Sequence, residues 1–96
     1  METIKVWKGT KSWVRGLENS EYTTLEFTGR EIGYQKIVDE YDERYYTVRR
    51  AYETEDGKVV VHQVDFAPLG EDVEAIIFVY DTLDEAAGAG WGDLLK

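Results

Sequence analysis

The chain has 96 residues, a length that suits one domain. Its 20 acidic residues outweigh its 11 basic residues and give a formal net charge of −9, so electrostatic repulsion disfavours direct binding to nucleic acid or to an anionic membrane surface. The sequence contains no cysteine, which excludes disulfides, thiolate metal sites and cysteine nucleophiles. Hydrophobic residues make up 43% of the chain, a share that predicts a packed core rather than disorder.

The pattern along the chain also predicts its organisation. No repeat and no linker rich in Gly, Pro or Ser divides it, so we expect a single domain over residues 1–96. The first residues lack the apolar stretch of a secretory signal, and no apolar run approaches the roughly 20 residues that span a bilayer. We therefore expect a cytoplasmic protein with no membrane association.

Short runs of β-branched and aromatic residues, separated by Gly, Asn and Asp, predict a chain made mostly of strands. An alternative is a helix over 33–50, where apolar residues also recur at helical spacing. We favour strands in that window because its Ile, Val, Thr and Tyr residues suit a pleated surface and residues 41–44 are typical of a turn. The predicted strands span 3–8, 12–16, 22–28, 31–38, 44–53, 58–66 and 73–81, of which 12–16 has the weakest pattern.

The segment Glu55-Asp56-Gly57 lies between two strand-like runs and predicts a β-hairpin. A two-residue turn would pair Tyr52 with Val61 and would mix polar and apolar groups on both faces. A three-residue loop, with Gly57 in the left-handed region, instead gathers apolar residues on one face. We predict this second register, which pairs Tyr46 with Phe66, Val48 with Val64, Arg50 with His62 and Tyr52 with Val60, and leaves Thr47, Arg49, Gln63 and Asp65 on the other face.

The last third of the chain predicts one strand and one helix. Residues 75–80 are apolar on both faces, which is typical of a central strand covered from both sides. Thr82 suits a helix N-cap, and Asp84 and Glu85 would lie in the first turn, where the helix dipole favours acids. Glycines at 88, 90 and 92 predict a short, irregular helix that depends on packing through Trp91. The apolar residues at helical spacing are Leu83, Ala87, Trp91 and Leu94.

Together these elements predict an α+β fold that is mostly β, with a twisted or partly closed antiparallel sheet of about five to seven strands and one C-terminal helix. The sequence contains no phosphate-binding loop, dinucleotide fingerprint, metalloprotease motif or nucleophile elbow, and its one histidine cannot build a multi-histidine metal site. We therefore expect no cofactor, and the sequence favours a non-catalytic role.

The predicted hairpin places an unusual polar pair on its apolar face. Arg50 and His62 oppose each other between Tyr46 and Tyr52, so a cation, an imidazole and two phenols could bind a small anion or a polar ligand. The arginine would also lower the affinity of the histidine for a proton. The alternative is structural: Arg50 extends past tyrosine rings to an acidic partner, and His62 is hydrogen-bonded at the edge of the sheet.

Acidic residues gather in the predicted turns. The first interpretation is that they have no binding role and are solvated loop tips that keep a sheet protein soluble. The alternative is a binding surface that engages a basic protein, in its sharpest form by imitating the phosphates of a nucleic acid. The residues assigned to this partner surface are Asp39, Glu40, Asp42, Glu43, Glu71, Asp72 and Glu74, and Glu53, Glu55 and Asp56 lie at another turn.

No resemblance to a known family identifies a function, so two hypotheses follow from the residues alone. The leading one is a small acidic interaction module that engages a basic partner, such as a nucleic-acid-binding protein. The alternative is a ligand-binding or catalytic domain centred on Arg50 and His62. The seven tyrosines are more than a small core can bury, so some are exposed, and this favours a partner surface or a homodimer.

Overall fold

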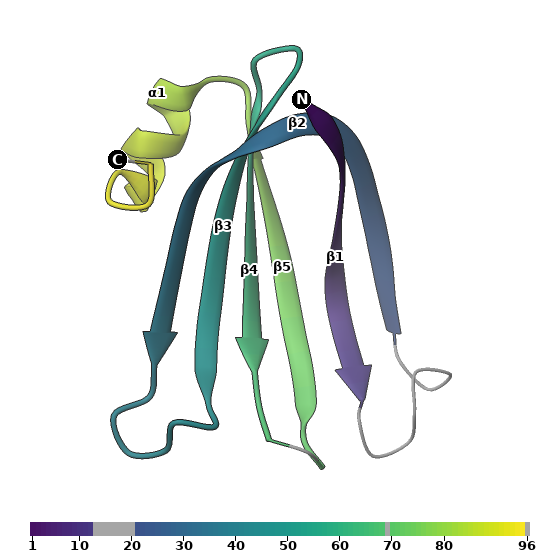
Figure 1. Ribbon diagram of the computed structural model, residues 1–96, viewed down its shortest axis with the longest axis vertical. Helices are drawn as coiled ribbons and strands as arrows, with labels where there is room; N and C mark the ends of the chain where they lie inside the picture. The colour runs from purple at the N-terminus through teal and green to yellow at the C-terminus, as the bar shows by residue number, and fades with distance from the viewer. Residues whose placement is uncertain (13–20, 69, 96) are drawn as a thin grey trace.

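The computed structural model describes residues 1–12, 21–68 and 70–95, and these ranges form an antiparallel barrel followed by a short helical segment (Figure 1). The fold is therefore mostly β with one C-terminal helix, as predicted, and the number of strands is five. The elements are β1 (Glu2–Ser12), β2 (Glu21–Val38), β3 (Tyr46–Thr54), β4 (Val59–Phe66), β5 (Asp72–Tyr80), α1 (Leu83–Ala86) and the π-helical turn η2 (Ala87–Trp91).

Strand β2 is long because it pairs first with one neighbouring strand and then with another. Its first half pairs with β1, its second half pairs with β3, and Gly29 has a partner in both ladders. Figure 1 shows β2 arching over the upper end of the barrel between these two ladders. The predicted strands 22–28 and 31–38 are thus one strand, and the alternative helix over 33–50 does not form. Of the predicted strand 12–16, Ser12 belongs to β1, and residues 13–16 lie outside the described ranges.

The β3–β4 hairpin adopts the register predicted from its side-chain pattern. Arg50 pairs with His62, and Tyr52 pairs with Val60. Gly57 has a φ of 85°, a left-handed conformation that glycine adopts without a steric penalty. Residues Tyr46, Val48, Arg50 and Tyr52 of β3 therefore share one face with Val60, His62, Val64 and Phe66 of β4.

The opposite face of this hairpin is polar over only half of its length. Thr47, Arg49, Gln63 and Asp65 lie on it as predicted, but the upper half carries apolar residues that the C-terminal segment covers. Ala51, Val59 and Val61 are fully buried there and form a core with Ala86 and Leu94. The four polar residues predicted for this face are thus confirmed, and the upper half of the face is apolar because the helical segment folds back over it.

The C-terminal segment has the predicted start and the predicted anchor. The side chain of Thr82 accepts a hydrogen bond from the amide of Glu85, so Thr82 caps a helix that soon becomes the irregular turn η2. Trp91 donates from Nε1 to the hydroxyl of Tyr80 over 2.7 Å and packs against Phe78 at a ring-centroid distance of 5.4 Å. Among the described residues, neither helical segment has the length and the apolar character that a membrane-spanning helix needs.

Strand β5 is not the fully covered central strand that its apolarity predicts. It pairs with β4 along most of its length, but its ladder with β1 covers only residues 72–75. Beyond Ala75, β1 diverges from β5 because it follows β2 toward the arch. Ile76 is 45% exposed, Phe78 36% and Val79 53%. The apolar run thus belongs to a strand that, over residues 76–80, pairs with a neighbouring strand on one side only among the described residues.

Candidate functional site

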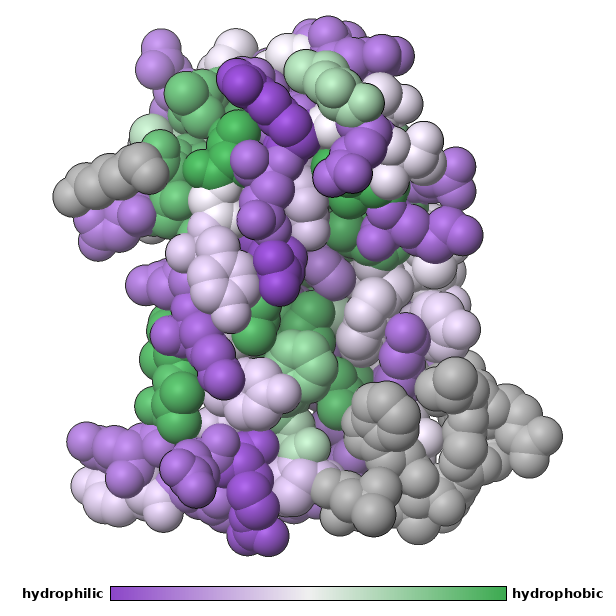
Figure 2. Space-filling model, in the orientation of Figure 1, coloured by the Kyte–Doolittle hydropathy of each residue, from purple (hydrophilic) through white to green (hydrophobic). Residues whose placement is uncertain are grey.

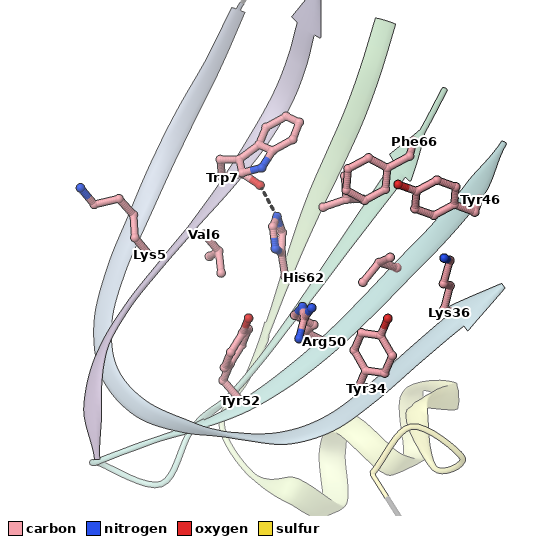
Figure 3. Close-up of a pocket in the computed structure, with 12 residues that line it drawn as sticks. Lys5, Val6, Trp7, Tyr34, Lys36, Tyr46, Arg50, Tyr52, His62 and Phe66 are labelled. Atoms are coloured by element: carbon pink, nitrogen blue, oxygen red, sulfur yellow. Dashed lines mark hydrogen bonds between the residues drawn. The ribbon is translucent and has the colours of Figure 1, made fainter. Parts of the chain in front are cut away.

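A groove lies between β1 and the concave face of β2, β3 and β4, and we call it the aromatic groove (Figure 3). Its volume is about 450 Å³. Its described lining contains five aromatic and three cationic side chains and no carboxylate, although acids outnumber bases by 20 to 11 in the chain. The four residues of the predicted ligand site, Tyr46, Arg50, Tyr52 and His62, all line this groove.

Two further lining residues, Tyr34 and Lys36, reach the groove because β2 contains a bulge. Glu31 pairs with Tyr52 while Gly33 pairs with Ala51, so one extra residue, Ile32, lies between successive pairs. Without the bulge, strict alternation would put Glu31 and Tyr34 on opposite faces. With it, both oppose residues of the concave face, and Ile32 turns toward the core beneath the C-terminal segment. A glycine inside a strand pattern was the available signal for this bulge.

The two cations inside the groove are each held against a tyrosine ring. The guanidinium of Arg50 lies 4.6 Å from the ring centroid of Tyr34 and donates from Nη1 to Glu31 Oε1 over 2.7 Å. This hydrogen bond raises the pKa of Arg50, so the side chain stays charged. The ammonium of Lys36 lies 4.5 Å from the ring centroid of Tyr46. Both cations are therefore positioned before any ligand arrives.

The far wall and the rim complete the lining. Tyr46 stacks on Phe66 at a centroid distance of 4.8 Å, which makes a flat aromatic surface. Trp7 stands on the opposite wall, on β1 (Figure 3). Lys5 lies at the rim, where its ammonium points away from the centre and lies 3.8 Å from Glu26 (Figure 3). Apart from Lys5, the positive charge of the lining comes from Arg50 and Lys36.

His62 is buried and joins β4 to β1. Its Nε2 lies 2.7 Å from the main-chain oxygen of Trp7, and because a carbonyl oxygen only accepts, Nε2 carries the hydrogen (Figure 3). Burial lowers the pKa of His62, and the positive charges of Arg50 and Lys11 lower it further against the opposing effect of the Trp7 carbonyl. The predicted influence of Arg50 has the right direction, but burial is the larger cause. Catalytic proton transfer through Nε2 would have to break this contact between strands.

The predicted acidic partner residues lie at the lower end of the barrel, which is the second candidate site. The β2–β3 turn and the β4–β5 turn both lie there (Figure 1), and the hydroxyl of Tyr45 donates to the carboxylate of Glu71 between them. Figure 2 shows hydrophilic residues gathered at this end. Glu53, Glu55 and Asp56 lie at the opposite end, so they do not extend this surface.

Some of these carboxylates hold the turn itself. Asp39 Oδ1 accepts hydrogen bonds from the amides of Tyr41 and Asp42. Asp42 binds Arg44 through both carboxylate oxygens, at 3.0 and 2.8 Å, and the hydrogen bonds from Arg44 lower the pKa of Asp42. The other predicted acids are exposed, and we call them the acidic end: Glu40, Glu43, Glu71, Asp72 and Glu74.

In the described ranges, no group of three His, Asp or Glu side chains could hold a metal ion. Comparison with family models, with curated proteins and with solved structures finds no match to this chain. The function must therefore be argued from the chemistry of the aromatic groove and of the acidic end.

Proposed function

We propose that the protein binds a small organic anion with a planar, apolar portion in the aromatic groove. The observation that carries this proposal is the composition of the lining, which concentrates cations and aromatic rings and contains no described carboxylate in a chain of net charge −9. This is the alternative that the sequence left open, and the geometry supports it better than it supports catalysis.

Each part of the ligand would meet a suitable group. A carboxylate or phosphate oxygen can accept hydrogen bonds from Arg50 and Lys36, and such charge-assisted bonds are about twice as strong as neutral ones. The planar portion can stack on the Tyr46–Phe66 pair or lie against Trp7. The volume of about 450 Å³ falls in the range of small-molecule sites.

The groove is also organised in advance of binding. Arg50 is fixed by Tyr34 on one side and by Glu31 on the other, so little side-chain entropy remains to be lost on binding. The bond from Arg50 to Glu31 uses Nη1, and with respect to the described residues the other guanidinium nitrogens remain available as donors toward a ligand. The carboxylate of Glu31 partly neutralises the charge of Arg50. A ligand that carries a stacking group as well as a negative charge should therefore bind better than a small anion alone.

The test is a titration with phenyl phosphate and benzoate, followed by NMR of the backbone amides, with benzyl alcohol as the uncharged probe and acetate as the non-aromatic probe. We expect saturable binding of the two aromatic anions and amide shifts centred on residues 34–36, 46–52 and 62–66. Arg50→Gln should weaken binding at least about tenfold, since a lost charge-assisted hydrogen bond is worth about 1.5–3 kcal/mol.

Arg30→Gln is the matched control. Arg30 lies on β2, the strand that pairs with the strand of Arg50, and it also binds a carboxylate, that of Glu53 at 2.9 Å, but it does not line the groove. This variant should bind as the unmodified protein does. Equal weakening by both substitutions, or binding of acetate as tight as that of phenyl phosphate, would contradict the proposal.

A second candidate function is the recognition of a basic protein by the acidic end, and nucleic-acid mimicry remains its sharpest form. The observation that favours it is the Tyr45–Glu71 contact, which brings the two predicted acidic turns together. Because Asp39 and Asp42 hold the turn, the charge test reverses Glu40 and Glu43, or Asp72 and Glu74. Capture of a decalysine peptide should weaken at low salt and converge with the original chain at high salt, because exposed charges are screened. Unchanged capture would exclude this surface.

A further inference from the structure

The side of β5 that faces away from β4, over residues 76–80, is an unpaired sheet edge, and we call it the free β5 edge. Residues 76–80 form a ladder with β4 on one side. On the other side the ladder with β1 ends at the pair of Gly9 with Ala75, and no strand of the described ranges pairs with β5 beyond it. The main-chain donors and acceptors on this side therefore resemble those that accept an added strand in other sheets.

The side chains along this edge are apolar and accessible on both faces. Ile76 and Phe78 are exposed on the outer face, and Val79 is exposed on the inner face. A hollow of about 550 Å³ lies beside the edge, between β5 and the neighbouring parts of β1 and β2. An extended segment entering this hollow could pair with β5 and bury apolar side chains on both of its own faces.

The charges at the two ends of the edge indicate the kind of segment that fits. Asp72 and Glu74 are exposed before it, and Asp81, Asp84 and Glu85 are exposed after it. A second copy of this chain, paired antiparallel along the same edge, would place these two acidic ends against each other. Like charges in that position oppose dimerisation, whereas basic flanks on a partner segment would be attracted to both ends.

We propose that the free β5 edge binds an extended peptide segment of a partner protein, with an apolar centre of about five residues and basic residues on both flanks, by strand addition. This binding surface is separate from the aromatic groove, since none of residues 76–80 lines that groove. It gives the protein a second site whose affinity comes from main-chain hydrogen bonds and whose specificity comes from alternating side chains and flanking charge.

The test uses a labelled nine-residue peptide with two lysines at each end and a centre that alternates valine and threonine. A second peptide replaces the central valine with proline, which keeps the charges but removes a main-chain donor and breaks the extended pairing. We expect saturable binding of the first peptide, at least tenfold weaker binding of the proline peptide, and slower amide hydrogen exchange at residues 76–80 when the first peptide is bound.

Two variants of the protein localise the site. Ile76→Lys places a positive charge on the edge and should weaken binding of the basic peptide at least tenfold. Val38→Lys is the matched control, because Val38 is a strand residue of similar exposure, 47% against 45%, at the end of β2 where β2 pairs with β3 and not with β5. It should leave the affinity within twofold.

Several outcomes would overturn the proposal. One is equal binding of the proline peptide, and another is equal weakening by both lysine variants. A third is protection confined to residues outside 76–80. The last is a dimer of the protein alone that Ile76→Lys abolishes, because that result would assign the edge to a second copy. The groove titration with phenyl phosphate is independent of all four, so failure here leaves the proposed function standing and success here does not support it.

Discussion

Trp91→Ala should destabilise the protein by about 3–4 kcal/mol, near the range for truncating an aromatic residue in a core. Trp91 makes three contacts that alanine loses. Its hydrogen bond to the Tyr80 hydroxyl is worth about 1 kcal/mol, its ring contact with Phe78 about 1 kcal/mol, and its position 5.4 Å from the guanidinium carbon of Arg49 about 0.5 kcal/mol. Apolar area that the ring buries over the sheet accounts for the rest.

The measurement is urea denaturation followed by far-UV circular dichroism, which does not depend on the fluorescence of the residue removed. Trp91→Phe should cost only about 1–2 kcal/mol, because it keeps a ring over the sheet and loses the indole donor. A double-mutant cycle with Tyr80→Phe should then give a coupling energy of about 0.5–1.5 kcal/mol for the hydrogen bond.

A decrease of less than about 1 kcal/mol in the free energy of unfolding of Trp91→Ala would contradict the anchoring role of Trp91. Removal of residues 83–96 is a second check, because it uncovers Ala51, Val59 and Val61. The truncated chain should unfold at a lower temperature or aggregate, and an unchanged thermal midpoint would show that the segment contributes no stability.

Three further predictions concern backbone geometry and pH. Gly57→Ala should destabilise the protein by about 1 kcal/mol or more, since a φ of 85° penalises a Cβ atom, and a neutral result by urea denaturation would count against the hairpin loop. Gly33→Ala should cost about 1–3 kcal/mol, because its Cβ would collide with the main-chain oxygen of Leu94, whereas Gly88→Ala has open space and should be neutral or stabilising in the same assay. The pKa of His62 is lower in the folded chain than in the unfolded chain. As the pH falls below about 6.5, the unfolded chain therefore binds more protons than the folded chain. The free energy of unfolding should then decrease by at most about 1.4 kcal/mol per pH unit. His62→Gln should remove this dependence between pH 7 and 5.5, and a flat profile for the unmodified protein would contradict the pKa shift.

Several features were predictable from the sequence because they depend on neighbours along the chain. The register of the β3–β4 hairpin follows from alternation with a period of two and from a glycine that tolerates positive φ. The start of α1 follows from the side chain of Thr82, which needs only the amide three residues later. The pairing of Arg50 with His62 follows from the same register. The part of the aromatic groove that β3 and β4 contribute could therefore be predicted from the sequence.

The rest was decided by contacts between segments that are distant in the sequence. The bulge at Ile32 brings Tyr34 and Lys36 to the groove, and a one-residue shift of this kind reverses every later side chain without changing the local pattern. The bond from His62 to Trp7 and the loss of a neighbour along β5 both depend on where β1 meets and leaves the barrel. The apolar run of β5 predicts a strand covered on both sides, but local hydrophobicity does not encode whether a second strand pairs along it. The place where β1 leaves β5 decides that the edge over residues 76–80 stays unpaired.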